Sequence, residues 1–139
     1  MPTLTAPMRS WEPVLRHRSE AEVPEVVARL ERAGLSPEVV HHALRDAGDA
    51  LYTAAQGGAH GWADRFGGPL VAALLAAEIS ALTVHLNSRT SSVRSMAVED
   101  LLEDYSAVTV AAELGVSRQK VYEVARASGR PSHHMSHAP

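Results

Sequence analysis

The sequence of 139 residues contains no cysteine, a single lysine and few aromatic side chains. Without cysteine, disulfides, thiolate zinc sites and cysteine nucleophiles are excluded, and a reducing compartment is the simplest one to reconcile with the composition. The residues after Met1 lack the charged and then apolar order of a signal peptide. We therefore expect a cytoplasmic protein.

Sequence signatures of catalysis and of cofactor binding are also missing. The chain has no GxGxxG, GxxxxGK[ST], GxSxG or HExxH motif. Among its eight histidines, His42 lies four residues from both Glu38 and Asp46, and His60 lies four residues before Asp64. Such spacing is compatible with a metal or ligand sensor, but solvent-facing or singly bonded histidines explain it more simply. We expect no enzyme, no cofactor and no metal site.

Charge is distributed unevenly along a chain whose formal net charge is −3. Residues 36–85 carry five acidic side chains against two arginines, whereas residues 107–130 carry four basic side chains against two acidic ones. Phosphate binding needs a local positive potential. The C-terminal region is therefore the part of the chain that suits a nucleic acid.

Apolar residues recur at helical spacing throughout, and no segment alternates as a strand does, so we predict an all-α domain of about six helices. We expect residues 1–18 to form an arm that packs through Trp11, Val14 and Leu15. The predicted helices are residues 19–34 with a Ser19–Glu22 cap and Gly34 as the stop, 36–56 after a Ser36 cap and Pro37, 70–86, 91–104, 107–114 and 117–126.

Two breaks are expected between these helices. The glycine-rich segment from Gly57 to Pro69 leaves room for one or two turns of helix, and "NSRTSS" at residues 87–92 interrupts the apolar stretch that follows. That stretch, Leu70 to Leu86, carries Glu78 and is short for a membrane span, so we predict a buried helix. In residues 91–104 the pattern predicts one inward and one outward set: Val93, Met96, Ala97, Leu101 and Leu102 inward, and Glu99, Asp100, Glu103 and Asp104 outward.

The last twenty or so residues of this pattern, "AVTVAAELGVSRQKVYEVAR", resemble the helix-turn-helix of bacterial transcription regulators. Such a motif needs inward residues four apart, a small residue where its helices cross, a turn that tolerates positive φ, and an apolar plug. The sequence offers candidates for each of these positions: Val110 and Leu114 inward, Ala111 at the crossing, Gly115 in the turn, Val116 as the plug, and Val121 and Val124 inward on the second helix.

The resemblance implies sequence-specific binding of double-stranded DNA by a bundle that ends in a helix-turn-helix. The second helix of this motif enters the major groove with its N-terminal side chains toward base edges. The residues expected to contact DNA are Ser106, Thr109, Ser117, Arg118, Gln119, Lys120, Tyr122, Arg126 and Arg130. Because one helix in one groove binds weakly, we expect a homodimer acting as a transcriptional regulator.

The predicted organisation is an arm at 1–18, a core and dimerisation region at 19–88, a DNA-binding region at 89–130 and a disordered tail at 131–139. The helix from Leu70 to Leu86 is the first candidate for the dimer interface, with a place in the monomer core as the alternative. Two other functions stay open at this point. The hairpin is also compatible with a protein-interaction module of an antitoxin-like or scaffold kind, and Trp62 and Phe66, with Tyr52 and Trp11, are candidates for an effector pocket.

Overall fold

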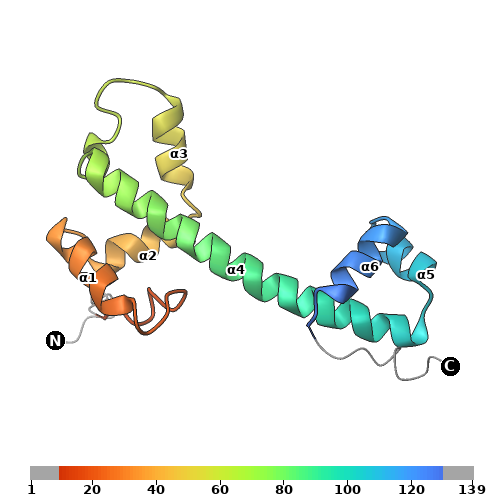
Figure 1. The fold of residues 1–139 in the computed structure, drawn as a ribbon. Coiled ribbons are helices and arrows are strands. Elements are labelled where there is room, and N and C mark those ends of the chain that lie inside the picture. The colour runs from red at the N-terminus through yellow and green to blue at the C-terminus, as the bar shows by residue number, and fades with distance from the viewer. Residues whose placement is uncertain (1–9, 130–139) are drawn as a thin grey trace, which may run out of the picture. The chain divides into compact units, whose positions relative to one another are not determined.

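The computed structural model describes residues 10–129, and every regular element in that range is helical (Figure 1). This confirms the all-α prediction. The elements are α1 (Val23–Arg32), α2 (Pro37–Arg45), α3 (Asp49–Gln56), a 3₁₀ turn η1 (Asp64–Phe66), α4 (Pro69–Asp104), α5 (Ala107–Leu114) and α6 (Arg118–Arg126). The chain forms two compact units, residues 1–86 and 87–139, and the division falls within α4.

In the first unit, the segment before α1 is part of the hydrophobic core. Trp11, Val14 and Leu15 are buried in one cluster with residues of α1, α2 and α4, as the sequence predicted. The Trp11 indole also donates a hydrogen bond of 2.9 Å from Nε1 to Oε2 of Glu31. This segment therefore packs as part of the unit.

Two helix ends in this unit are capped or terminated by the residues predicted from the sequence, and one is not. Ser36 accepts a hydrogen bond from the Val39 N–H and Pro37 follows it, and Gly34 turns the chain with a φ of 86°, as predicted. Helix α1, however, begins at Val23 without a side-chain cap. The Ser19 hydroxyl donates to the Glu22 carboxylate at 3.1 Å. Since these side chains bind each other, neither caps the backbone, and the predicted Ser19 cap is wrong.

The helix predicted for residues 36–56 is two helices. Helix α2 ends at Arg45, and Ala47 and Gly48 take left-handed φ values of 59° and 79° before α3 begins. The Asp46 carboxylate accepts hydrogen bonds from the N–H groups of Gly48 at 2.8 Å and Ala50 at 3.3 Å. Such side-chain bonds to the backbone compete with helix continuation, and this competition explains why the apolar periodicity alone was misleading.

The interruption predicted at residues 87–92 does not exist, because α4 runs without a break from Pro69 to Asp104. The segment contains no glycine or proline, and its hydroxyls fit a helix. The Thr90 hydroxyl donates to the Asn87 carbonyl at 3.2 Å, within the same helix. Helix α4 begins at Pro69, next to the predicted start, and the preceding glycine-rich segment contains one short 3₁₀ turn, within the one or two turns predicted.

Helix α4 is long and apolar enough to cross a membrane by length and composition, and core helices of soluble proteins pass the same test. In the first unit it contributes Val71 and Leu75 to the hydrophobic core. Its Glu78 is buried as well, at 2% exposure. The segment from Leu70 to Leu86 therefore does belong to a core on one face.

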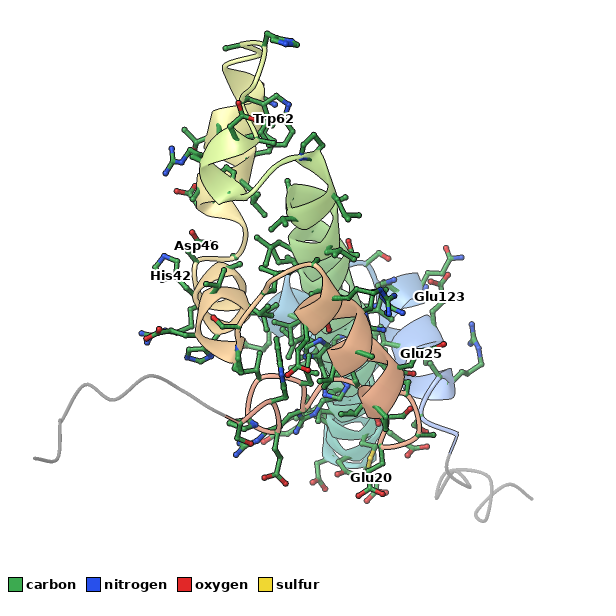
Figure 2. The ribbon with its side chains drawn as sticks, turned by 90° about the vertical axis from the view of Figure 1, so that its left-hand side faces the viewer. Glu20, Glu25, His42, Asp46, Trp62 and Glu123 are labelled. Carbon is green, nitrogen blue, oxygen red and sulfur yellow. The ribbon has the colours of Figure 1, made fainter. Side chains whose placement is uncertain are left out.

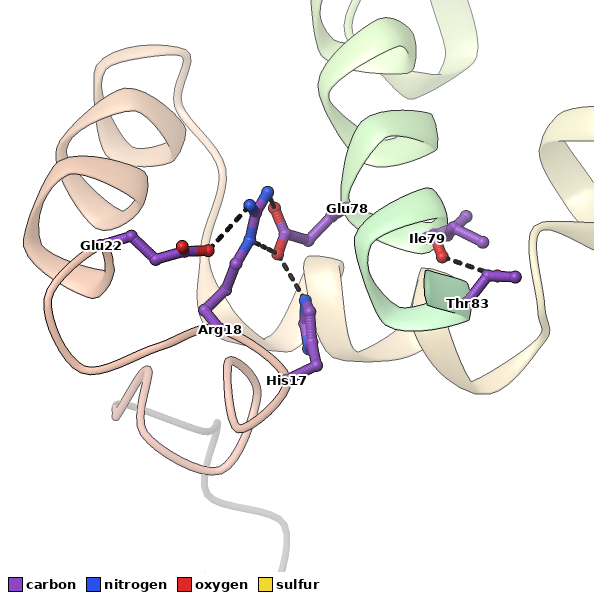
Figure 3. A network of polar contacts seen from close by, with 6 residues as sticks. All are labelled: His17, Arg18, Glu22, Glu78, Ile79 and Thr83. Carbon is purple, nitrogen blue, oxygen red and sulfur yellow. Dashed lines mark hydrogen bonds and ion pairs between the residues drawn. The ribbon is translucent and has the colours of Figure 1, made fainter. Parts of the chain in front are cut away.

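Glu78 is bound on both carboxylate oxygens by residues that precede α1 (Figure 3). Arg18 donates from Nε at 2.9 Å and from Nη2 at 3.0 Å, and His17 Nε2 lies 2.6 Å from Oε2. Arg18 also donates to Glu22 at 3.1 Å. Burial alone raises the pKa of Glu78, but the hydrogen bonds from Arg18 and His17 outweigh it and hold the pKa below its ordinary value. This network joins the segment before α1 to α4.

Replacing Glu78 by Gln tests the network. The charge of Arg18 then loses its buried partner and keeps only Glu22, and we expect the free energy of unfolding at pH 7 to fall by about 3 kcal/mol. Because the folded-state pKa of Glu78 is depressed, its contribution is present above the unfolded-state pKa of about 4.3 and is lost as the pH falls through the folded-state value. Urea unfolding of both proteins between pH 7 and pH 3 measures this. A difference between them that does not shrink in acid contradicts the assignment.

Candidate nucleic-acid interface

The second unit is built around the hairpin of α5 and α6, which packs on the last turns of α4 (Figure 1). Its buried cluster draws on all three helices and comprises Val98, Ala107, Val110, Ala111, Val121 and Val124. Val121 has no exposed surface. This small apolar cluster determines which face of each helix is turned to solvent.

The buried face of α4 in this unit differs from the predicted one. Ser95, Val98 and Glu99 are buried, whereas Val93 and Leu101, predicted to face inward, are exposed. Met96 and Ala97 are also exposed, and Leu102 is half-buried. The prediction of Glu99 as an outward residue is therefore wrong. The reason is that α5 and α6 cover the face that carries Ser95 and Val98, although the opposite face is richer in apolar side chains.

Helix α5 begins and ends as the sequence indicates. The Ser106 hydroxyl accepts from the Thr109 N–H at 3.1 Å and donates to the Thr109 hydroxyl at 3.0 Å. Gly115 ends the helix in the left-handed conformation, with a φ of 72°. Val110 and Ala111 are buried, so their predicted inward positions are confirmed.

Leu114 and Val116, two apolar residues at the turn, were predicted to be buried but are exposed. Leu114 is 46% exposed and Val116 is 41% exposed. The Gly115 and Val116 N–H groups both donate to the Ala111 carbonyl, at 2.9 Å and 3.1 Å, so the chain reverses tightly there. Neither the Leu114 nor the Val116 side chain belongs to the buried cluster of this unit. Val116 is therefore no apolar plug.

Helix α6 is fixed by a cap and by two buried valines. The Ser117 hydroxyl accepts from the Lys120 N–H at 3.0 Å, and Val121 and Val124 are buried, as predicted. The side chains left outside are those of Arg118, Gln119, Lys120, Tyr122 and Arg126. Gln119 Nε2 lies 3.5 Å from the carboxylate of Glu123, the α6 residue labelled in Figure 2.

The structure therefore brings most of the predicted contact residues to two exposed places. Arg118, Gln119 and Lys120 follow Ser117 at the start of α6, with Tyr122 and Arg126 further along the helix. Ser106 and Thr109 lie exposed at the start of α5. Arg130 and the tail at 131–139 lie outside the described residues.

The start of α6 has the chemistry of an anion-binding and base-reading surface. The first N–H groups of a helix lack acceptors within the helix and carry a partial positive charge. Arg118 and Lys120 add two cations there, and Gln119 adds an amide with both a donor and an acceptor. Since all three side chains are exposed, a ligand reaches them without any rearrangement of the core.

The sequence also offered a candidate metal site and a candidate effector pocket. Within residues 10–129 no group of three metal-ligating side chains comes together. The Asp46 carboxylate, labelled with His42 in Figure 2, is occupied with the backbone before α3. Tyr52 and Trp62 do line one apolar pocket of about 350 Å³, with Leu51 and Ile79, but Trp11 and Phe66 are not part of its lining.

The chain matches no known protein family, no curated protein and no solved structure.

Removing the α6 cap tests how the candidate interface is held. In Ser117→Ala the Lys120 N–H loses its acceptor, and we expect a loss of about 1 kcal/mol in the local free energy of opening. Hydrogen exchange of the Val121 and Val124 amides measures this as about a fivefold loss of protection. Ser117→Asp, which keeps a capping oxygen, and Ser92→Ala, an exposed serine inside α4, serve as controls. Equal protection in wild type and Ser117→Ala contradicts the cap.

Proposed function

We propose that this chain is a sequence-specific double-stranded DNA-binding protein, without catalytic activity, in which α5 and α6 form a helix-turn-helix. The observation that carries the proposal is the orientation of α6. Val121 and Val124 are buried, which leaves Arg118, Gln119 and Lys120 exposed at the N-terminal end of the helix. In helix-turn-helix proteins it is this end of the second helix that contacts base edges.

Each side chain at this end has a role that follows from its chemistry. Arg118 pairs with guanine O6 and N7, and Gln119 pairs with adenine N6 and N7, in a major groove about 12 Å wide. Lys120, Tyr122 and Arg126 bind phosphates along the flanks of the helix. The hydroxyls of Ser106, Thr109 and Ser117 and the N–H groups beside them complete the phosphate contacts. We include Arg130 among the proposed phosphate contacts because of its charge and its place in the sequence.

The charge pattern of the second unit supports one-sided binding. Residues 107–129 carry three basic and two acidic side chains, whereas the last turns of α4 expose Asp100, Glu103 and Asp104. An acidic surface repels phosphates. DNA is therefore favoured at α6 and disfavoured at the end of α4.

A single recognition helix gives low affinity, so we propose a two-fold dimer that reads half-sites about 34–36 Å apart. A small dimeric protein of this kind acts as a transcriptional regulator in the cytoplasm.

One observation favours a second function. Val108, Leu114 and Val116 form an exposed apolar set on α5 and the turn, at 62%, 46% and 41% exposure. In a DNA complex, apolar side chains mainly contact the thymine methyl group. In the second candidate function, these exposed apolar side chains dock another protein, as in an antitoxin-like or scaffold subunit.

Titration of a fluorescent mixed-sequence duplex tests the proposal. Contacts to phosphates release counterions, so affinity must fall steeply with salt. We expect Arg118→Ala/Lys120→Ala to weaken binding by about tenfold or more at low salt and to reduce the slope of log affinity against log salt by about 2.

The matched control is Arg32→Ala/Arg45→Ala, which removes the same charge from exposed positions on α1 and α2. This control should change binding little beyond the general effect of net charge. Equal loss in both double variants would assign the binding to overall charge. Absence of duplex binding by folded wild type at low salt would favour the protein-docking function.

A further inference from the structure

Helix α4 carries a row of exposed side chains that no part of the described second unit covers. Val93, Ala97, Leu101 and Tyr105 are each four residues apart, and all four are exposed. Val93 is 68%, Leu101 37% and Tyr105 56% exposed. The Tyr105 N–H donates to the Leu101 carbonyl at 2.8 Å, so the helical geometry continues to Tyr105. Residues four apart form a ridge along a helix.

This ridge is separate from the face that holds the hairpin. Val98 packs in one cluster with residues of α5 and α6, Leu102 packs against that cluster, and Ser95, one turn before Val98, is also buried. Helix α4 thus uses one face to build the core of the unit and presents a second, apolar face to solvent. An apolar row of this length on a helix is typical of an interface.

We propose that the ridge is where two copies of this chain pair, with the two α4 segments antiparallel. The order of residues is self-complementary about a point midway between Ala97 and Leu101. Antiparallel pairing at that point sets the small Ala97 against Leu101 of the second copy and Val93 against Tyr105 of the second copy. Around a two-fold axis each of these contacts occurs twice.

The charges beside the ridge select the same arrangement. Two exposed arginines, Arg89 and Arg94, lie before the proposed midpoint, and three exposed acidic side chains, Asp100, Glu103 and Asp104, lie after it. Antiparallel pairing brings the basic end of each copy beside the acidic end of the other. Parallel pairing would set the two basic ends together and the two acidic ends together, and like charges across an interface are costly. Opposite charge at the two ends of the ridge therefore favours a second copy in the antiparallel direction.

The inference rests on the proposed function in one respect, since a dimer is what supplies a second recognition helix. It replaces the segment from Leu70 to Leu86, the interface candidate of the sequence, by a surface within residues 93–105.

Sedimentation equilibrium of the full chain without DNA tests the pairing. We expect a dimer in the wild type and a dissociation constant at least about tenfold higher in Val93→Glu, which places four carboxylate oxygens at the interface instead of two isopropyl groups. Val84→Glu is the control, because Val84 is 70% exposed on α4 but lies outside the ridge. A monomeric wild type, or equal dimer stability in Val93→Glu and wild type, overturns the proposal.

Charge exchange gives a second test that does not depend on apolar contacts. Arg94→Asp and Asp104→Arg should each weaken the dimer, because each puts a charge beside like charges at the facing end of the second copy. Circular dichroism of each variant confirms that the helices are intact. Dimer stability equal to that of the wild type in both variants contradicts the antiparallel arrangement.

Duplex binding at low salt, measured on the same samples, separates this proposal from the proposed function. A monomeric wild type that binds duplex overturns the interface and leaves DNA binding standing. A dimer that Val93→Glu dissociates, and that binds no duplex, supports the interface and contradicts DNA binding.

Discussion

Both hydrophobic cores of the described chain depend on burial against one helix, α4. Its first part contributes Val71 and Leu75 to the core of the first unit, and Val98 is its contribution to the core of the second. Because Val98 packs in one cluster with Val121 and Val124, it also decides which face of α6 is left in solvent. The exposure of Arg118 and its neighbours is thus a consequence of how the valines of α6 are covered. A substitution that changes the packing of these valines would therefore reorient the proposed recognition surface without changing any residue of that surface.

Those parts of the fold that depend on neighbouring residues could be predicted from the sequence. Ser36 with Pro37, and Gly115, affect only the few residues next to them. Their positions in the sequence therefore indicate directly where a helix begins or ends. The exposed start of α6 was predictable for a similar reason. The spacing of Val121 and Val124 defines a buried face, and Arg118, Gln119 and Lys120 fall outside it.

The errors concern features decided by partners distant in sequence or by side chains that bind the backbone. Asp46 splits the predicted second helix, because its carboxylate takes two N–H groups that a longer helix would have used. In the sequence, Glu78 is a single acidic residue in an apolar stretch. Its partners Arg18 and His17 are about 60 residues away and reach it only in the folded chain. Periodicity likewise cannot tell which of two apolar faces of α4 the hairpin covers, and the face with Val93 is left exposed.

The most direct measurement is an NMR titration of the isotopically labelled chain with duplex DNA, followed through the backbone amides. If α6 enters the groove, the largest shifts fall on residues 117–126, with smaller ones at Ser106 and Thr109, and they weaken as salt is added. The amides of α2 and α3 should stay unchanged. Shifts centred on Val108, Leu114 and Val116 with little change in α6, or no shifts at all at low salt, would contradict the account.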